Sequence, residues 1–538
     1  MADKYDVIVI GAGVAGLGTA CLLSRDFGQK VLVLEKAPFI GGRLASFVGK
    51  GDKMYLDGLE LDANGFKRAL AYVGAWIPKC TPDLETCFKE GLFDGCTIDT
   101  GHGLFWGNKG KIRCLMDYLD RPVDMPCNVG FAFVDYKKGN KAYQVGKGEP
   151  YAWMSPEGFK STMKALRDMA LMNFDDVAQT AHMSFEEWLQ ARNVHREAYD
   201  YIKVLAASQT GQADLALTPA PDVLGHMCIA GDIKMNLVEG SCSTVANPGT
   251  MAFALLMEEV LKENGGEVRR NSAVVETIIE KGRVKGVTYK TAEGFETVYA
   301  DRIICTVPSK QMLNVIHPRY FPQELVDRIQ KQFWGAGMIT GYGNMKSNIW
   351  ADKGIEERSF IYMPDVIGKE EGYSGCVDMV LWNLASTAQG SNSNPTLTSE
   401  TGVAPEGKHG WIFSTAMTHE EMRNARKVSR VVEWCEGWGS RTFKSKWKSE
   451  MEFLLWMCCD HAFAWIQPIG YDRIDVKSPT IEGLYFAGDQ YGERLWGCGV
   501  DAAALSAALC VDSMMGSNTE ERIFPFYHRA MPARVRGW

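Results

Sequence analysis

The strongest constraint on the fold lies in residues 5–35. Asp6–Ile10 is a short β-branched apolar run, typical of a buried parallel strand. It leads into Gly11-Ala12-Gly13-Val14-Ala15-Gly16 and then into a helical stretch. A second apolar run, Val31–Leu34, ends at Glu35. A strand, a glycine turn, a helix, a strand and an acid in this order predict a βαβ unit that binds a dinucleotide.

Each glycine of this turn has its own expected role. Gly11 permits the tight turn, Gly13 lets the backbone approach a pyrophosphate, and Gly16 lets the helix pack against the strand. The N-terminus of the helix offers free N–H groups to the anion. Glu35 can accept hydrogen bonds from an adenosine ribose. A turn in an α/β domain without a ligand is the alternative, and it explains Glu35 poorly.

A second glycine pair favours FAD over a nicotinamide dinucleotide. Glu35-Lys36 is followed by Gly41-Gly42-Arg43. This spacing would bring backbone and a guanidinium group onto the diphosphate. Arginine suits that task because its planar fork pairs with phosphate oxygens at two points. A surface Gly-Gly turn is the structural alternative.

Together, these motifs resemble the flavin-dependent amine oxidase and phytoene desaturase superfamily. The similar blocks are Asp6–Gly16, Glu35, Gly41–Arg43, Leu237–Pro308 and Gly488-Asp489. The stretch Asp99-Thr100-Gly101-His102 is similar to the family's segment beside the flavin ring. The resemblance implies an α/β fold, with a Rossmann-type FAD-binding domain built from discontinuous segments and a mixed α+β substrate domain.

The resemblance also implies cofactor contacts. Glu35 would bind the adenosine ribose, Arg43 the diphosphate and Asp489 the ribityl chain. Val275 would touch adenine through its backbone, although a plain core valine is equally compatible with the sequence. The helix that begins near Val500 would point its N-terminus at the flavin pyrimidine, where negative charge builds on reduction. The expected cofactor-binding residues are Gly11, Gly13, Gly16, Glu35, Lys36, Gly42, Arg43, Val275, Gly488, Asp489 and Val500.

Three residues are candidates for catalysis, and no metal site is expected. His102 stands in the flavin-proximal motif and could deliver a proton to a carbanion or enolate. Tyr491 and Trp496 are expected near the ring. The alternative to a catalytic role is that His102 is a structural residue whose ring is hydrogen-bonded to backbone groups.

The choice between branches of the superfamily depends on a lysine. Amine oxidases of this family place one in a strand of the substrate domain, but the corresponding stretch Phe333–Thr340 holds none. The nearest lysines are Lys331 and Lys346. Gly497–Ala503 also resembles the desaturase pattern. We therefore expect FAD-dependent chemistry, by hydride movement at flavin N5, at a carbon–carbon or conjugated unsaturated centre of an apolar small molecule. The sequence does not distinguish between desaturation, saturation and isomerisation.

Three other functions remain open: a flavin amine oxidase, a redox-inert FAD-bound structural subunit and a nicotinamide-linked dehydrogenase. The aromatic and methionine content of residues 334–465 would suit an apolar tunnel, whereas core packing is the other interpretation.

The motifs predict a division into two domains. Residues 1–135, 236–310 and 470–516 are assigned to the FAD-binding domain, with 48–95 as an irregular insertion of unknown role. Residues 136–235 and 311–469 are assigned to the substrate domain, and 517–538 to a C-terminal tail. Ser155 and Ser184 have the spacing of helix caps.

Charge and apolar patterning limit the partners. Lys and Arg number 58 and Asp and Glu 66, a net charge of −8, which argues against a nucleic-acid binder. No apolar run reaches the roughly 18 residues of a membrane span. The chain is therefore expected to be cytoplasmic, with 15 largely reduced cysteines. Its C-terminal end is basic and contains Phe524 and Phe526, so peripheral contact with the inner face of a membrane remains an open alternative. A homo-oligomer is also an open alternative.

Overall fold

The structure is a computed structural model. The residues that it describes are 5–100, 105–106, 110–123, 130–135, 141–144, 154–210, 214–228, 242–243, 249–334, 337–354, 359–363, 379–383, 404–405, 407–460, 465–466, 469–470, 473–492, 497 and 499–528. Among these, no helix is both long and apolar enough to cross a membrane.

A largely parallel sheet contains the N-terminal strand. β1 pairs in parallel with β2 and β15, and the paired residues are apolar and buried except for half-buried Arg302, which lies opposite Val7. Buried parallel strands read as continuous apolar runs, which is why the N-terminal pattern predicts them correctly. The sheet order is β12 (Glu267–Arg269), β2 (Val31–Leu34), β1 (Tyr5–Ile10), β15 (Phe295–Cys305), β14 (Arg283–Lys290) and β13 (Ala273–Glu280), with β23 (Leu484–Phe486) also on β15.

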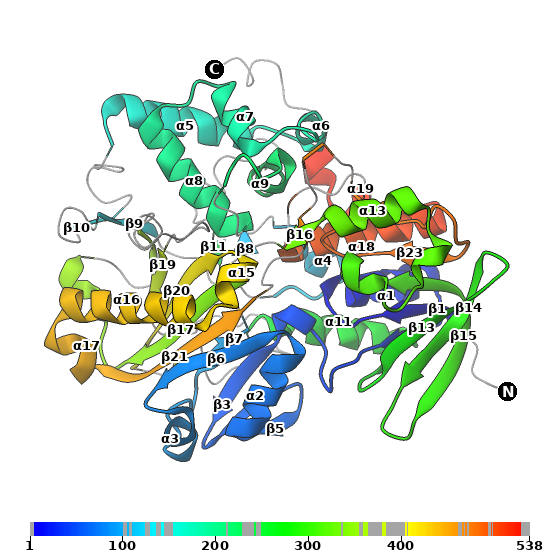
Figure 1. Cartoon of the computed structure of the whole chain (residues 1–538), viewed down its shortest axis with the longest axis horizontal. Helices are drawn as coiled ribbons and strands as arrows, with labels where there is room; N and C mark the ends of the chain where they lie inside the picture. The colour runs from blue at the N-terminus through cyan, green and yellow to red at the C-terminus, as the bar shows by residue number, and fades with distance from the viewer. Residues whose placement is uncertain are drawn as a thin grey trace.

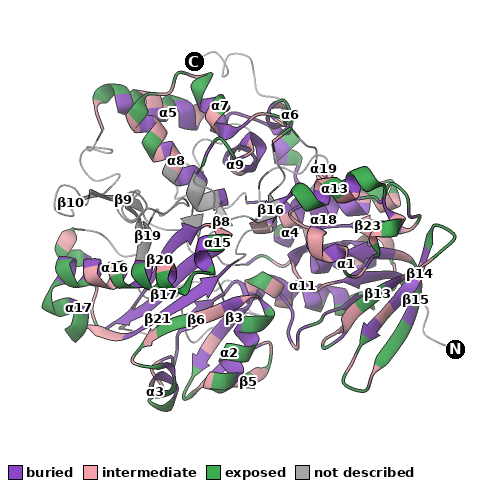
Figure 2. Ribbon diagram, in the orientation of Figure 1, coloured by how far each residue is buried: buried purple, intermediate pink, exposed green. Residues whose placement is uncertain are grey.

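Three helices from distant parts of the chain pack together beside this sheet. α1 (Val14–Phe27) contacts both α11 (Met251–Glu263) and α18 (Gly499–Met515). Figure 1 shows these helices together beside the parallel strands, and Figure 2 shows that most of α1 and β1 is buried. Chain segments from the start, middle and end of the sequence therefore assemble one α/β unit.

The stretch Val268–Glu276 contributes to two separate strands. β12 ends at Arg269 and β13 begins at Ala273. Between them, the backbone N–H groups of Asn271 and Ser272 donate to the carbonyls of Ala37 and Glu35. The chain leaves the sheet here because it bonds to the loop after β2 instead.

A second sheet forms the other large unit. β17 runs near its centre, between β20 and β21, and all nine of its residues are buried. In the view of Figure 1, α16 (Ala425–Phe443) and α17 (Ser445–Ser449) lie along this sheet. The order is β10 (Lys141–Gln144), β9 (Gly130–Asp135), β18 (Ser359–Met363), β19 (Met379–Asn383), β20 (His409–Met417), β17 (Gly337–Met345), β21 (Met451–Cys459) and β6 (Ala75–Thr81).

Residues 48–95, expected to be irregular, form regular structure instead. Asp62 and Asp83 look like loop charges in the sequence, but each accepts a backbone N–H as the N-cap of a helix. β6 pairs with β21 and so joins the second sheet. The elements are β3 (Ser46–Lys50), β4 (Lys53–Leu56), β5 (Leu59–Leu61), α2 (Ala63–Tyr72), β6 and α3 (Leu84–Lys89); β3, β4 and β5 share a sheet with β7 (Thr97–Asp99).

The helices between residues 156 and 227 pack against one another, and the predicted caps begin two of them. Ser155 caps the first helix through Gly158 N, and Ser184 forms a capping box with Glu187. The helices are α5 (Pro156–Ala170), α6 (Phe174–Ala178), α7 (Phe185–Gln190), α8 (Arg196–Thr210) and α9 (Ala220–Met227). Other helices are α4 (Lys111–Tyr118), α12 (Ser309–Met312), α13 (Gln323–Lys331) and α15 (His419–Met422).

The tryptophan-rich part of the chain forms a core. One cluster packs between β17, β20 and β21 and helix α16. Gly341 and Gly343 of β17 make room for it, because a Cβ atom there would come within 3 Å of the Trp456 and Trp411 rings. The buried tryptophans of this cluster are Trp350, Trp411, Trp438, Trp447 and Trp456. These side chains therefore pack a core instead of lining a tunnel.

The described part of the expected tail also packs against the molecule. α19 (Thr519–Ile523) is followed by a short 3-10 helix, Pro525–His528. Phe524 and Phe526 are buried, so neither is available for the lipid contact that the sequence suggested. The last ten residues, 529–538, lie outside the described residues.

Candidate functional site

The glycine turn after β1 has the geometry that the motif predicts. Gly11 has φ +104°, and a Cβ atom there would lie 2.5 Å from Thr306 Oγ1. A Cβ atom on Gly16 would lie 2.0 Å from the Gly11 carbonyl oxygen, so only glycine lets α1 approach β1 this closely. A Cβ atom on Gly13 would meet nothing within 4 Å. The turn is thus tightly packed at Gly11 and Gly16 and open at Gly13, where a phosphate group would approach.

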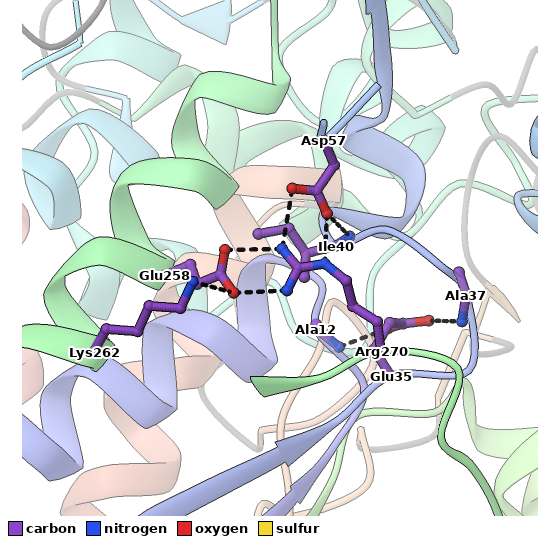
Figure 3. Close-up of polar contacts among 8 residues, drawn as sticks. All are labelled: Ala12, Glu35, Ala37, Ile40, Asp57, Glu258, Lys262 and Arg270. Atoms are coloured by element: carbon purple, nitrogen blue, oxygen red, sulfur yellow. Dashed lines mark hydrogen bonds and ion pairs between the residues drawn. The ribbon is translucent and has the colours of Figure 1, made fainter. Parts of the chain in front are cut away.

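Glu35 is buried and holds the turn in place. One carboxylate oxygen accepts from Ala12 N and the other from Ala37 N, each at 2.8 Å (Figure 3). Burial raises the pKa of the Glu35 carboxyl, and the bonds from Ala12 and Ala37 oppose that rise. The acid therefore joins the glycine turn to the loop after β2, while Lys36 beside it is exposed.

The second glycine pair lies directly over the turn. Gly41 N donates to Ala12 O at 2.8 Å, and Gly41 and Gly42 have φ of +90° and +55°. An added Cβ atom on Gly42 would lie 3.9 Å from Gly13 Cα, so the two glycine segments form one surface. Arg43 follows and ion-pairs with Asp489 at 3.2 Å. The structure brings the predicted diphosphate and ribityl residues together.

An arginine that sequence analysis missed anchors this loop. Arg270 forms paired hydrogen bonds with Asp57 (2.7 and 3.0 Å) and with Glu258 (2.8 and 2.9 Å), as Figure 3 shows. Asp57 also accepts from Ile40 N at 3.0 Å, and Lys262 reaches Glu258 at 3.0 Å. Burial opposes the Arg270 charge, but the bonds to Glu258 and Asp57 outweigh it and raise the pKa of Arg270. The network fixes the loop that carries the second glycine pair.

A second missed arginine holds the segment after β23. Arg473 donates to Asp489 O at 2.8 Å and to Gly497 O at 3.1 Å, and it also ion-pairs with Asp222. Burial raises the pKa of the Asp222 carboxyl, and the Arg473 charge opposes that rise. Arg473 therefore clamps both ends of residues 489–497 to the start of α9.

The other predicted cofactor residues take positions at the edge of this region. Gly488 has φ +147°, and its N–H donates to Ser506 Oγ of α18 at 3.0 Å. Val275 is 40% exposed, and it sits at a β-bulge where the pairing of β13 with β14 skips a residue. This exposure argues against a plain core valine and leaves backbone groups open to a ligand. Val500 is half-buried in the first turn of α18.

A missed pair of charges lies where α18 begins. Asp501 is buried, and its carboxylate accepts from Ile112 N at 3.0 Å, which caps α4 from outside because Gly110 offers no side-chain cap. Lys111 is also buried and donates to Gly225 O at 2.6 Å. Burial raises the pKa of Asp501, and the Lys111 charge opposes that rise. The N-termini of two helices are thereby held against each other.

Of the three predicted catalytic residues, the structure describes only Tyr491. His102 and Trp496 lie outside the described residues. Tyr491 is buried, its ring stacks on Phe486 at 5.2 Å, and its hydroxyl donates to Val307 O at 2.7 Å. Burial raises the pKa of Tyr491 well above its usual value. A catalytic role for Tyr491 stays a prediction, and this geometry is that of a packing residue.

Asp99, just before the predicted flavin-proximal histidine, is a buried anchor. Its carboxylate accepts from Ser46 Oγ at 2.5 Å and from the Thr250 N–H at 3.1 Å. Burial raises its pKa, and these bonds oppose the rise. Tyr342 of β17 donates its hydroxyl to Asp99 O at 2.5 Å. The second sheet therefore contacts the small sheet that contains β7 at Asp99. In the described segments, no group of three or more potential ligands is arranged to hold a metal.

The family follows from a comparison along almost the whole chain. The model of the flavin-containing amine oxidoreductase family matches residues 14–515. The chain belongs to this family. FAD is the cofactor of this enzyme class, and the open surface at Gly13 beside Glu35, Gly42 and Arg43 fits its adenosine diphosphate part.

The curated relatives include phytoene and zeta-carotene desaturases. A phytoene desaturase (neurosporene-forming) of Cereibacter sphaeroides is 23% identical over 467 residues, 80% of this chain and 76% of that protein. A 15-cis-phytoene desaturase of Arabidopsis thaliana is 23% identical over 313 residues, and the match spans 48% of its length. A zeta-carotene desaturase of Zea mays is 27% identical over 202 residues, 36% of this chain and 30% of that protein. The chain thus matches about half or less of these two plant proteins.

Solved structures share the fold at low identity. An oxidoreductase from Methanosarcina mazei aligns with a TM-score of 0.62 and 16% identity, over 96% of this chain and 100% of that one. A putrescine oxidase with bound putrescine aligns at 0.60 and 14%, over 96% and 100%. A Rab GDI from Plasmodium falciparum aligns at 0.55 and 14%, over 96% and 99%. Proteins with such different names show that this likeness concerns the fold alone.

Proposed function

We propose that this FAD-dependent oxidoreductase acts on a carbon–carbon or conjugated unsaturated centre of an apolar small molecule. The observation that supports it best is the face of the second sheet that looks toward Asp99. Tyr342 identifies this face through its bond to Asp99 O. Its paired neighbours, Ile412 and Leu455, are buried and apolar. Directly paired residues project to the same side of a sheet, so these three side chains form an apolar wall opposite Asp99, and Thr340 and Ser414 lie beside it on the same face.

The absence of a lysine in this wall supports carbon–carbon chemistry over amine oxidation. β17 carries no charged residue along its whole length. Lys331 and Lys346, the lysines nearest to the stretch where amine oxidases place theirs, are both exposed. An apolar wall orients a hydrocarbon and excludes water, and neither task needs a strong base.

The relatives support a polyene-like substrate, since three of them are named phytoene or zeta-carotene desaturases. Bound FAD supplies hydride transfer at its N5 atom. The residues of this chain hold the cofactor through the glycine turn, Glu35 and Arg43, and present the apolar wall to the substrate.

An oxygen-free assay tests the proposal. FAD-loaded protein is mixed with phytoene in detergent micelles, and dithionite-reduced protein with a conjugated polyene. The flavin absorbance at about 450 nm is followed in both cases. We expect bleaching in the first mixture or recovery in the second, and no change with putrescine. Bleaching by putrescine alone would favour amine oxidation, and no exchange with any organic substrate would favour a redox-inert subunit.

A further inference from the structure

The thiols of Cys80 and Cys87 lie close together at one edge of the molecule. Their sulfur atoms are 3.7 Å apart, and both thiols are free. Cys80 belongs to β6, the edge strand of the second sheet, and Cys87 to α3. Cys80 is half-buried, whereas Cys87 is fully buried behind it. The pair therefore has one sulfur within reach of a small thiol reagent and a second one in position to resolve the product.

The backbone on both sides of the pair is fixed. Cys80 is paired with Leu455 of β21, and the Cys87 N–H donates to Asp83 O at 3.0 Å within α3. The Cys87 thiol also contacts Pro82 O at 3.4 Å. A disulfide has an S–S bond of about 2.05 Å, so the sulfurs need to approach by less than 2 Å. Rotation about the side-chain bonds supplies a movement of this size.

From this geometry we propose that Cys80 and Cys87 form a reversible disulfide, and that the pair is a site of oxidative modification. The oxidant is a low-molecular-weight disulfide such as glutathione disulfide. Cys80 sulfur attacks it and releases one glutathione thiol, and Cys87 sulfur then displaces the second. Two protein thiols lose two electrons and two protons, and one disulfide is reduced to two thiols. The new bond joins α3 to the edge strand of the sheet.

The electrostatics of the pair favour the disulfide at equilibrium and slow its formation. The hydrogen bond with Cys87 and then burial raise the pKa of Cys80, and Asp83 adds to the rise. Dithiols with a stabilised thiolate resist oxidation because their reduced form is favoured, and this pair lacks that stabilisation. The attacking thiolate is scarce, so the reaction is slow at neutral pH.

The sequence around the pair makes the test direct. Trypsin cleaves after Lys79 and Lys89, so both cysteines fall within one peptide, residues 80–89. The native holoprotein is incubated in glutathione buffers of increasing disulfide content at pH 8, alkylated and digested. We expect this peptide to appear two mass units lighter than its reduced form, without alkyl groups or bound glutathione. The neighbouring Cys458 and Cys459, buried in β21, serve as the internal control and should be alkylated after denaturation.

Two variants keep the test decisive. C87S leaves Cys80 without a resolving thiol, and we expect it to accumulate a mixed disulfide with glutathione. C80S leaves the buried Cys87 alone, and we expect no adduct. Peptide 80–89 that stays fully alkylated in the most oxidising buffer, or wild-type protein that retains glutathione on Cys80, would overturn the proposal. FAD content and flavin reduction are measured on the same samples. They report on the proposed function independently, because the thiol chemistry needs neither.

Discussion

The guanidinium of Arg43 lies 3.2 Å from the carboxylate of Asp489, although the two residues are 446 positions apart. The arginine side chain is 40% exposed and the aspartate side chain 8%. Arg43 follows the second glycine pair, and Asp489 follows β23. The pair therefore joins the two segments that are predicted to bind the diphosphate and ribityl parts of FAD.

Replacement of Arg43 should weaken FAD binding and its salt dependence. R43Q keeps a long polar side chain but removes the charge and the bidentate fork. We expect the FAD dissociation constant to rise about tenfold, equivalent to about 1.4 kcal/mol. Flavin fluorescence titrations at low and high salt measure both effects. R319Q, at an exposed arginine of the 3-10 helix Pro318–Tyr320, is the control. Equal affinity in R43Q and wild type would remove Arg43 from the cofactor site.

The glycine turn allows cofactor binding to be separated from folding. A Cβ atom on Gly13 meets no protein atom within 4 Å, whereas one on Gly16 would lie 2.0 Å from Gly11 O. G13A should therefore keep the apoprotein melting temperature and weaken FAD binding at least tenfold. G16A should lower the apoprotein melting temperature by several degrees, because α1 must move away from β1. Thermal unfolding of the apoproteins and FAD titration test this pair, and normal FAD affinity in G13A would contradict it.

The Arg270 network should matter for stability more than a surface ion pair does. Asp57 and Glu258 are each 7% exposed, and R270M removes the guanidinium from both of these buried carboxylates, so Glu258 keeps only Lys262 and Asp57 only the Ile40 N–H among the partners described above. We expect a loss of about 3 kcal/mol in the free energy of unfolding. R283M, which breaks an exposed pair with Glu482, should lower the free energy of unfolding far less, because solvent screens this pair. Urea unfolding compares the two variants, and similar losses would contradict the role given to Arg270.

One contribution to stability should depend on pH near neutrality. The hydrogen bond to Glu520 raises the pKa of His528 above its usual value, and burial opposes this rise. The charged histidine thus stabilises the fold fully below about pH 6.5, and the effect fades as pH rises through the higher folded pKa. The difference in melting temperature between wild type and H528Q should shrink from pH 6 upward. A difference that grows with pH would contradict this assignment.

Tyr491 offers a test of its predicted catalytic role. Y491F removes the hydroxyl that donates to Val307 O. We expect a stability loss of about 1 kcal/mol from the lost hydrogen bond, and no change in the rate of flavin reduction. A general acid or base typically contributes at least about a hundredfold in rate. A rate loss of that size in a well-folded Y491F protein would restore the catalytic assignment.

Local motifs made part of this site predictable. β1, the glycine turn, α1, β2 and Glu35 interact within one short stretch, so their spacing in sequence carries the geometry. The networks around this stretch have no such local signal. Arg270 meets Asp57 across 213 positions, and Arg473 meets Asp222 across 251. Their partners are set by tertiary packing, and no spacing rule connects them.

Part of the regular structure in residues 48–95 has a local signal in the sequence. Asp62 and Asp83 lie three residues before Gly65 and Thr86, whose N–H groups they accept. This is the spacing of an N-cap, and it predicts the starts of α2 and α3. The pairing of β6 with β21 joins segments far apart in sequence, so it could not be seen locally.

Product analysis after a single turnover tests the central claim most directly. FAD-loaded protein is mixed without oxygen with a limiting amount of phytoene or of a conjugated polyene, and the lipid extract is analysed by mass spectrometry. A desaturase or saturase removes or adds two hydrogen atoms for each flavin reduced or reoxidised, so we expect a mass change of about two units with that stoichiometry. An unchanged polyene, together with an aldehyde and peroxide formed from putrescine in air, would contradict the proposal.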